Sequence, residues 1–353
     1  MTHLPRIAFL ATLLALCVVL LGAYVRLSDA GLGCPDWPGC YGRIVPPTES
    51  EAVAAANAAF PERIVEVAKA WKEQLHRYAA SLLGLLIIAL AVLHQRHPYR
   101  PAGRIPVLLV ALVIFQGLLG MWTVTLLLKP LVVTAHLLGG LATLSLLWWT
   151  FLSVRSSAVH PLARATEPPR RRAFRWLLPA LAVLIVQIAL GGWTSTNYAA
   201  WACGMDFPDC HGSLWPEMDF ATGFTLWHGL GRDYEFGILD TPARTAIHWT
   251  HRLFAIVAAL VLGATALRLM TLGGGGGLSR VGLALVLLLL LQLGLGVSNV
   301  ILGLPLWVAV AHNGGAALLL LCLVTGLHAT IGTDAANTPL QAAQEHGQGR
   351  VAA

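Results

Sequence analysis

The chain has 353 residues, of which 57% are hydrophobic and only 11% are charged, and its mean hydropathy is +0.70. Soluble globular domains carry roughly 25% charged residues, so this composition excludes a soluble globular protein and indicates an integral membrane protein. The formal net charge of +6 requires no nucleic-acid partner, because basic residues gather on one side of membrane proteins for reasons of topology.

Apolar segments long enough to cross the hydrocarbon core, about 20 residues each, occur eight times. The first is too long for a cleaved signal peptide, and no small-residue cleavage site follows it, so we interpret it as a true span. We predict an all-α integral membrane protein with eight transmembrane helices, at residues 7–27, 73–93, 105–127, 131–153, 175–197, 245–268, 279–301 and 306–330.

Basic and acidic residues lie in alternate connections between these spans. The arginine-rich connections contain Arg96, Arg100, Arg104, Arg155, Arg164, Arg170, Arg171, Arg172, Arg175, Arg268 and Arg280. The long connection before the sixth span instead contains Asp206, Asp209, Glu217, Asp219, Asp233, Glu235 and Asp240. The positive-inside rule therefore predicts that both termini are cytoplasmic and that the two long loops lie outside.

The sequence repeats itself, with an offset that rises from 169 to 176 residues along the chain. LLGAYVRLSDAGLGC, ending at Cys34, aligns without a gap with ALGGWTSTNYAAWAC, ending at Cys203, and TAHLLGG around His136 matches VAHNGGA around His312. Such a repeat indicates tandem duplication of a four-helix unit. We predict two pseudo-symmetric four-helix bundles, 1–154 with an outer loop at about 28–72 and 175–330 with an outer loop at about 198–244, a cytoplasmic linker at 155–174, and a disordered cytoplasmic tail at 331–353.

Four histidines occupy matched positions in the two repeats. His136 follows His76 by 60 residues and His312 follows His251 by 61, and each pair falls near the outer ends of two spans. Ionisable groups at membrane depth normally face the bundle interior, where two facing imidazoles suit the axial positions of a haem iron. A single histidine is more often a hydrogen-bonded core residue, but matched pairs favour haem. Zinc or copper is the alternative, and zinc usually takes three or four protein ligands.

The residues beside these histidines distinguish the two repeats. Glu73 lies three residues before His76, whereas His248 lies three residues before His251, so each pair shares one helix face. A carboxylate there could transfer protons or stabilise a developing cation, or it could be a first-turn glutamate favoured by the helix dipole. His248 could compete for iron with His251, but the spacing to the partner histidine favours His251.

Arg77 and Arg252 directly follow His76 and His251, near the predicted outer boundary. A guanidinium in this position could pair with a haem propionate. It could also extend to the lipid headgroups, and the sequence leaves both interpretations open.

The positions of four cysteines support a location of the two long loops outside the cytoplasm. Cys34 and Cys40 lie in one long outer loop, and Cys203 and Cys210 lie in its counterpart. Because disulfides persist outside the cytoplasm, we expect one bridge within each loop. Cys17 and Cys322 fall within spans, where we expect inert packing residues.

The E-x-x-H-R motif of Glu73, His76 and Arg77, its counterpart at His251 and Arg252, the later histidines and the paired cysteines resemble those of the haem A synthase family over about residues 7–330. This resemblance implies an oxidoreductase acting on a CH or CH2 group, which oxidises the C8 methyl group of haem O to a formyl group through an alcohol intermediate, giving haem A for terminal oxidase assembly. It also implies haem b on His251 and His312 in the C-terminal half. His76, His136 and Glu73 would surround the substrate haem O.

The same resemblance implies a bacterial plasma-membrane protein with haem sites towards the outer face. Expected partners are the lipid bilayer, haem O, an unidentified electron donor or acceptor, the enzyme that makes haem O, and further copies of the chain. Two alternatives stay open at this point. A non-enzymatic bis-histidine cytochrome would use the four histidines symmetrically, and a periplasm-facing thiol oxidase would use reactive loop cysteines.

Overall fold

The computed structural model describes residues 3–97, 102–156 and 167–331. The predicted linker at 155–174 falls partly, and the predicted tail at 331–353 almost wholly, outside the described residues. Ten helices form within these ranges. Strand-type pairing in the described residues is limited to two isolated β-bridges. The all-α prediction is therefore confirmed for the described part of the chain.

Eight of these helices are long and apolar enough to cross a membrane, which confirms the predicted spans. They are α1 (His3–Leu27), α3 (Val67–Gln95), α4 (Ile105–Thr125), α5 (Pro130–Ser156), α6 (Glu167–Thr196), α8 (Thr241–Leu272), α9 (Gly277–Ile301) and α10 (Leu306–Ile331). Helices are favoured because a spanning segment must satisfy its backbone hydrogen bonds internally. Several begin earlier than predicted, α3 at Val67 and α6 at Glu167, because hydropathy does not detect polar first turns.

The remaining two helices are short and lie in the long loops. They are α2 (Ser50–Ala59) and α7 (Phe220–Gly223), and the hydropathy pattern did not predict them. Asp219 caps α7 by accepting a hydrogen bond from the Thr222 amide at 3.0 Å. Asp240 caps α8 in the same way through the Ala243 amide at 3.1 Å.

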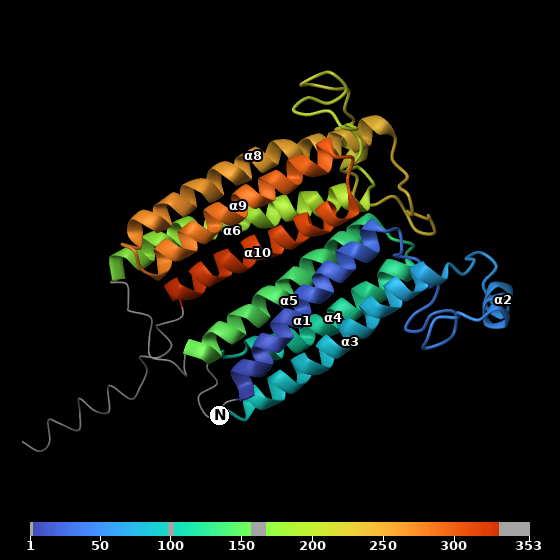
Figure 1. Ribbon diagram of the computed structural model, residues 1–353, viewed down its shortest axis with the longest axis horizontal. Coiled ribbons are helices and arrows are strands. Elements are labelled where there is room, and N and C mark those ends of the chain that lie inside the picture. Colours follow the sequence, from blue (N-terminus) through green and yellow to red (C-terminus); the bar gives the residue numbers. More distant parts are fainter. Residues whose placement is uncertain (1–2, 98–101, 157–166, 332–353) are drawn as a thin grey trace, which may run out of the picture.

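The spanning helices lie in two groups of four (Figure 1). In the first group α1 and α4 each contact α3 and α5, and in the second group α6 and α9 each contact α8 and α10. The two groups meet where α10 contacts α1 and α5 and where α5 contacts α6. Neighbour relations thus recur between the groups, while the pseudo-symmetry and the exact domain boundaries stay predictions.

Buried residues of all the spanning helices form one core cluster. Small residues on α1 let its neighbours approach closely, and large apolar side chains elsewhere on the spans stay uncovered. Examples of the uncovered side chains are Leu82, Leu85, Leu260, Leu287 and Leu290. Such surfaces would be an aggregation hazard in water, whereas lipid covers them in a multi-pass membrane protein.

Both long loops lie at the same end of the molecule (Figure 1), which we call the disulfide end. The structure joins Cys34 to Cys40 and Cys203 to Cys210, as the sequence predicted. Cys322 is half-buried, but Cys17 is exposed on α1. Cys17 lies within a span as expected, but its exposure does not fit the packing role, because its position on the helix directs it away from the neighbouring helices.

Candidate functional site

The four predicted axial histidines lie within the first three turns of their helices, at the disulfide end. His76 is on α3, His136 on α5, His251 on α8 and His312 on α10, and all four are half-buried. His76 interacts electrostatically with His136, and His251 with His312. The structure therefore brings together the two imidazoles of each half, and their ligation of iron stays a prediction.

A glycine on a neighbouring helix packs against each of these imidazoles. A methyl group on Gly22 would lie 2.9 Å from His76 Cε1, and one on Gly191 would lie 3.0 Å from His251 Cε1. These two glycines align in the sequence repeat. A methyl group would therefore require the His76 ring to move, and the His251 ring to shift by at least a few tenths of an ångström.

The second histidine of each pair has the same kind of neighbour. A methyl group on Gly120 would lie 3.6 Å from His136 Cε1, and one on Gly296 would lie 3.1 Å from His312 Cε1. These glycines also align in the repeat. The Gly296 contact is tight, whereas the Gly120 contact is at an ordinary van der Waals distance.

Three of the four imidazoles keep a buried Nδ1 without a hydrogen-bond partner among the described residues, namely His76, His136 and His312. His251 differs, because the side-chain amide of Gln187 lies 3.2 Å from its Nδ1. Turning that amide by half a turn would let its oxygen accept from Nδ1–H, which leaves Nε2 for a metal. Sequence reasoning missed Gln187. Gln187 could have been noticed as a polar amide in an apolar span, at a position where the first repeat has Val18.

Glu73 is buried, with 5% of its surface exposed, and both of its carboxylate oxygens are engaged. Oε2 accepts a hydrogen bond from the Cys34 amide at 2.8 Å, and Oε1 forms an ion pair with Arg77 Nη2 at 2.5 Å. Because α3 begins at Val67, Glu73 lies in the second turn. The helix-dipole explanation therefore loses its support, since that effect fades beyond the first turn.

Its counterpart His248 is also buried, at 4% exposure, and its Nδ1 lacks a partner among the described residues. It interacts electrostatically with His251, so it lies close to the second pair. The two halves consequently place different groups at equivalent positions. Both oxygens of the Glu73 carboxylate are bonded, whereas Nδ1 of the His248 imidazole has no hydrogen-bond partner where the structure is described.

Both arginines of the motif bind a disulfide loop. Arg77 Nη1 donates to the Asp36 carbonyl at 2.9 Å and also to the Gly39 carbonyl, while Arg252 Nη2 donates to the Pro208 carbonyl at 3.0 Å. The sequence predicted neither contact. Arg252 keeps a buried Nη1 that has no hydrogen-bond partner in the described part of the chain, so it retains a donor for an anionic group.

No three histidine, cysteine or acidic side chains converge as a metal-binding group within the described residues. Each half instead brings two imidazoles close together, and a glycine of a neighbouring helix lies nearest to Cε1 of each ring. Two imidazole nitrogens in each half are a donor set that would suit a haem iron, for which histidine is a common protein ligand.

The fold and the paired histidines together define a multi-pass helical membrane protein with two histidines close together in each half. The chain belongs to the family described as cytochrome oxidase assembly protein, COX15-CtaA, whose model matches residues 5–324.

Its curated relatives agree with this family. The heme A synthase of Shewanella oneidensis is 47% identical over 325 residues, which cover 92% of this chain and 95% of that protein. The heme A synthase of Erythrobacter litoralis is 28% identical and covers 91% and 94% of the two chains. That of Shouchella clausii is 27% identical and covers 76% and 83%. The predicted resemblance is thereby confirmed.

Proposed function

We propose that this protein is a haem A synthase, an oxidoreductase that converts the C8 methyl group of haem O into a formyl group, giving haem A for terminal oxidase assembly. Relatives named heme A synthase match nearly the whole chain. The observation that carries the proposal is the asymmetry between two similar histidine pairs, since only the first has a carboxylate, Glu73, beside it. A simple electron-transfer cytochrome has no need for that carboxylate, and the relatives favour neither it nor a thiol oxidase.

The first half is the substrate side in this proposal. His76 and His136 would hold the iron of haem O, and Glu73 would accept a proton as the substrate is oxidised. Oxidation of the alcohol intermediate to the aldehyde removes two electrons and two protons. A carboxylate fixed by the Cys34 amide and by Arg77 is already oriented for that proton transfer, which is a requirement for efficient general-base catalysis.

The second half is the cofactor side. His251 and His312 would hold haem b, which when bound supplies one-electron chemistry for the reaction. Gln187 supports His251, and the free donor of Arg252 suits a propionate. In the first half Arg77 already donates to Glu73 and to the loop carbonyls. Arg77 would have to give up one of these bonds to bind a propionate.

The protein would lie in the bacterial plasma membrane with both termini cytoplasmic and the disulfide end outside, which the distribution of arginines supports. An electron acceptor must take part, because haem O oxidation releases electrons. The enzyme that makes haem O is a further candidate partner, as are additional copies of this chain, since haem O is too apolar to travel freely through water.

The test is haem extraction and chromatography from membranes that contain this protein and a supply of haem O. We expect haem A or its alcohol precursor with the natural chain. With Glu73→Gln we expect haem O to accumulate and turnover to fall at least ~100-fold, the usual contribution of a general base. Glu66→Gln is the matched control, because the Glu66 side chain is exposed and pairs with Lys69, away from Glu73. Unmodified haem b alone in every variant would contradict the proposal.

A further inference from the structure

A segment of the second long loop crosses to the first half at the disulfide end. Its residues 227–236, which we call the strap, contact the turn between α4 and α5. The Tyr234 amide donates to the Leu127 carbonyl at 3.0 Å. Lys129 Nζ donates to the Gly229 carbonyl at 2.7 Å and lies 2.8 Å from the ring centroid of Trp227. The strap is therefore bound to the half to which it does not belong.

Tyr234 anchors the strap. Although it lies in a loop, it is 2% exposed and ranks among the largest fully buried side chains of the described residues. It packs with Leu32 from the first long loop and with Val124 and Leu128 beside the α4–α5 turn. Burying an aromatic ring removes about 150–250 Å² from solvent, which makes this contact the main apolar attachment of the strap.

Ion pairs fix the strap on both sides of this anchor. Arg63 of the first long loop pairs with Glu235 and with Asp233, the latter at 2.5 Å. Burial opposes the charge of Arg63, but the hydrogen bond and charge of Glu235 outweigh that effect, so the pKa of Arg63 is raised. Glu235 is mostly buried, whereas Asp233 is exposed. The Glu235 contact is thus the more protected of the two.

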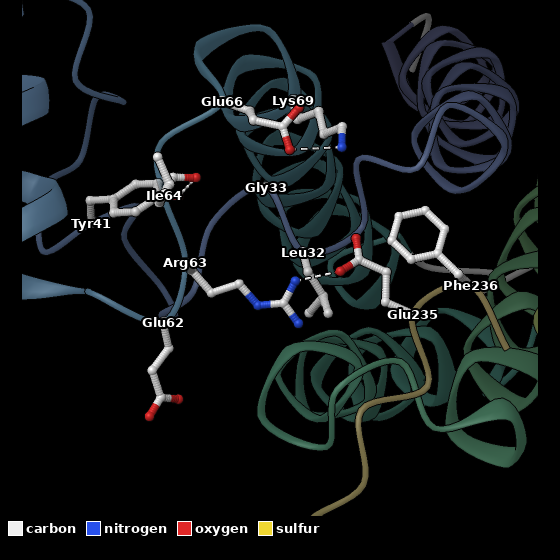
Figure 2. Close-up of a pocket in the computed structure, with 10 residues that line it drawn as sticks. All are labelled: Leu32, Gly33, Tyr41, Glu62, Arg63, Ile64, Glu66, Lys69, Glu235 and Phe236. Atoms are coloured by element: carbon white, nitrogen blue, oxygen red, sulfur yellow. Dashed lines mark hydrogen bonds and ion pairs between the residues drawn. The ribbon is translucent and has the colours of Figure 1, made fainter. Parts of the chain in front are cut away.

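The strap packs against the part of the first loop whose backbone binds the Glu73 side chain. Figure 2 shows Arg63 reaching Glu235 across a pocket of about 230 Å³, with Leu32 and Gly33 on its wall. Gly33 lies directly on α3, because a methyl group on it would be 2.6 Å from the Lys69 carbonyl oxygen. The next residue, Cys34, donates its amide hydrogen to Glu73.

We propose that the strap is a positioning element of the substrate half, with Tyr234 as its anchor. By packing on Leu32 it holds Gly33 and Cys34 against α3, and so it keeps the backbone amide aimed at Glu73. The cofactor half thereby completes the site of its neighbour. The role of Glu73 in this inference rests on the proposed function, whereas the mechanical link from Tyr234 to the Cys34 amide does not.

Hydrogen–deuterium exchange on the purified full-length protein tests this link. In Tyr234→Ala we expect amides at 31–36 to exchange at least about tenfold faster, as local opening becomes easier, while amides at 203–213 exchange as in the natural chain. Arg63→Gln should produce a smaller increase at the same amides. Trp215→Ala is the matched control, because this aromatic residue of the same loop lies outside the strap and is 70% exposed.

Haem analysis of the same variants separates positioning from general damage. Tyr234→Ala should lower the ratio of haem A to haem O while the haem b content of the second half is unchanged. Unaltered exchange at 31–36, or equal acceleration in both disulfide loops, would overturn the proposal. If Tyr234→Ala does not fold, Arg63→Gln and Glu235→Gln decide it by the same exchange criterion. A failure of the synthase assignment would appear in haem analysis of the natural chain and would leave the exchange result valid.

Discussion

A single methyl group at Gly22 or Gly191 would touch a histidine ring, whereas the same group at Gly117 or Gly294 would meet nothing within 4 Å. This contrast separates glycines that serve the site from those that are merely common in membrane helices. It also gives each half a probe of its own, since Gly22 faces His76 and Gly191 faces His251.

We therefore expect Gly22→Ala to displace His76, and Gly191→Ala to displace His251. Overpacking of this kind costs about 1–3 kcal/mol, so haem binding in the affected half should weaken several-fold or more. Haem content per protein and the spectrum of bis-histidine haem measure the effect. Gly117→Ala and Gly294→Ala should behave as the natural chain, and equal losses in all four variants would contradict a specific contact.

Gln187 is the second residue-scale difference between the halves. Gln187→Val installs the type of residue that the first repeat has at Val18 and removes the partner of His251 Nδ1. Loss of such a partner typically lowers metal affinity by about 10–100-fold. We expect weaker haem retention and a shifted midpoint potential in the second half only, as measured by potentiometric titration. An unchanged potential would argue against this contact.

At the scale of elements, each disulfide loop is attached to the helix that carries the first histidine of its half. The backbone bridges Cys40 to Arg43 and Cys210 to Ser213 turn both loops in the same way, and Arg77 and Arg252 bind carbonyls within them. The helix and its loop therefore behave as one unit.

Replacing Arg77 should detach the disulfide loop from α3 in the first half. Arg77→Ala removes the bonds to Glu73 and to the Asp36 and Gly39 carbonyls, and it leaves a buried carboxylate without its cation, which typically costs about 3–5 kcal/mol. We expect the Cys34–Cys40 bridge to become several-fold more accessible to a mild reductant, as measured by thiol alkylation. The exposed Arg43 provides the control, Arg43→Ala. Equal alkylation in the two variants would show that Arg77 does not hold the loop.

At the scale of the whole molecule, polar contacts connect the two groups of helices. Trp148 Nε1 on α5 donates to Thr325 Oγ1 on α10 at 2.8 Å. At the disulfide end, Arg26 donates to the Ser195 carbonyl at 2.5 Å and lies over the Tyr198 ring. These contacts and the strap fix the relation between the halves.

Trp148→Phe should weaken this interface without removing the aromatic ring. Hydrogen bonds between membrane helices contribute about 0.6 kcal/mol on average and up to about 1.7, so we expect a small fall in the midpoint of thermal unfolding. Thr143→Val is the control, because Thr143 bonds within its own helix. A double-mutant cycle with Thr325→Val should give the coupling energy, and a coupling near zero would exclude this contact as a stabilising link.

The sequence predicted the spans, the disulfides and the histidine pairs, since apolar length and an internal repeat are visible without a structure. Gln187 was missed because its significance depends on which helix lies opposite. The Arg77 contacts and the burial of Tyr234 could not be predicted either, because each joins a loop to residues that are distant in the sequence. Loop geometry is determined by such partners and not by local periodicity.

The strap also constrains the order in which the protein can be completed. A chain synthesised from its N-terminus supplies α1, α3, α4 and α5 before residues 227–236 exist, so Leu32, Val124 and Leu128 have no covering ring until most of the polypeptide has been made. The contact between Tyr234 and the first bundle therefore forms only after the second long loop has been made. In the proposal above, this contact links the completion of one bundle to the translation of the other.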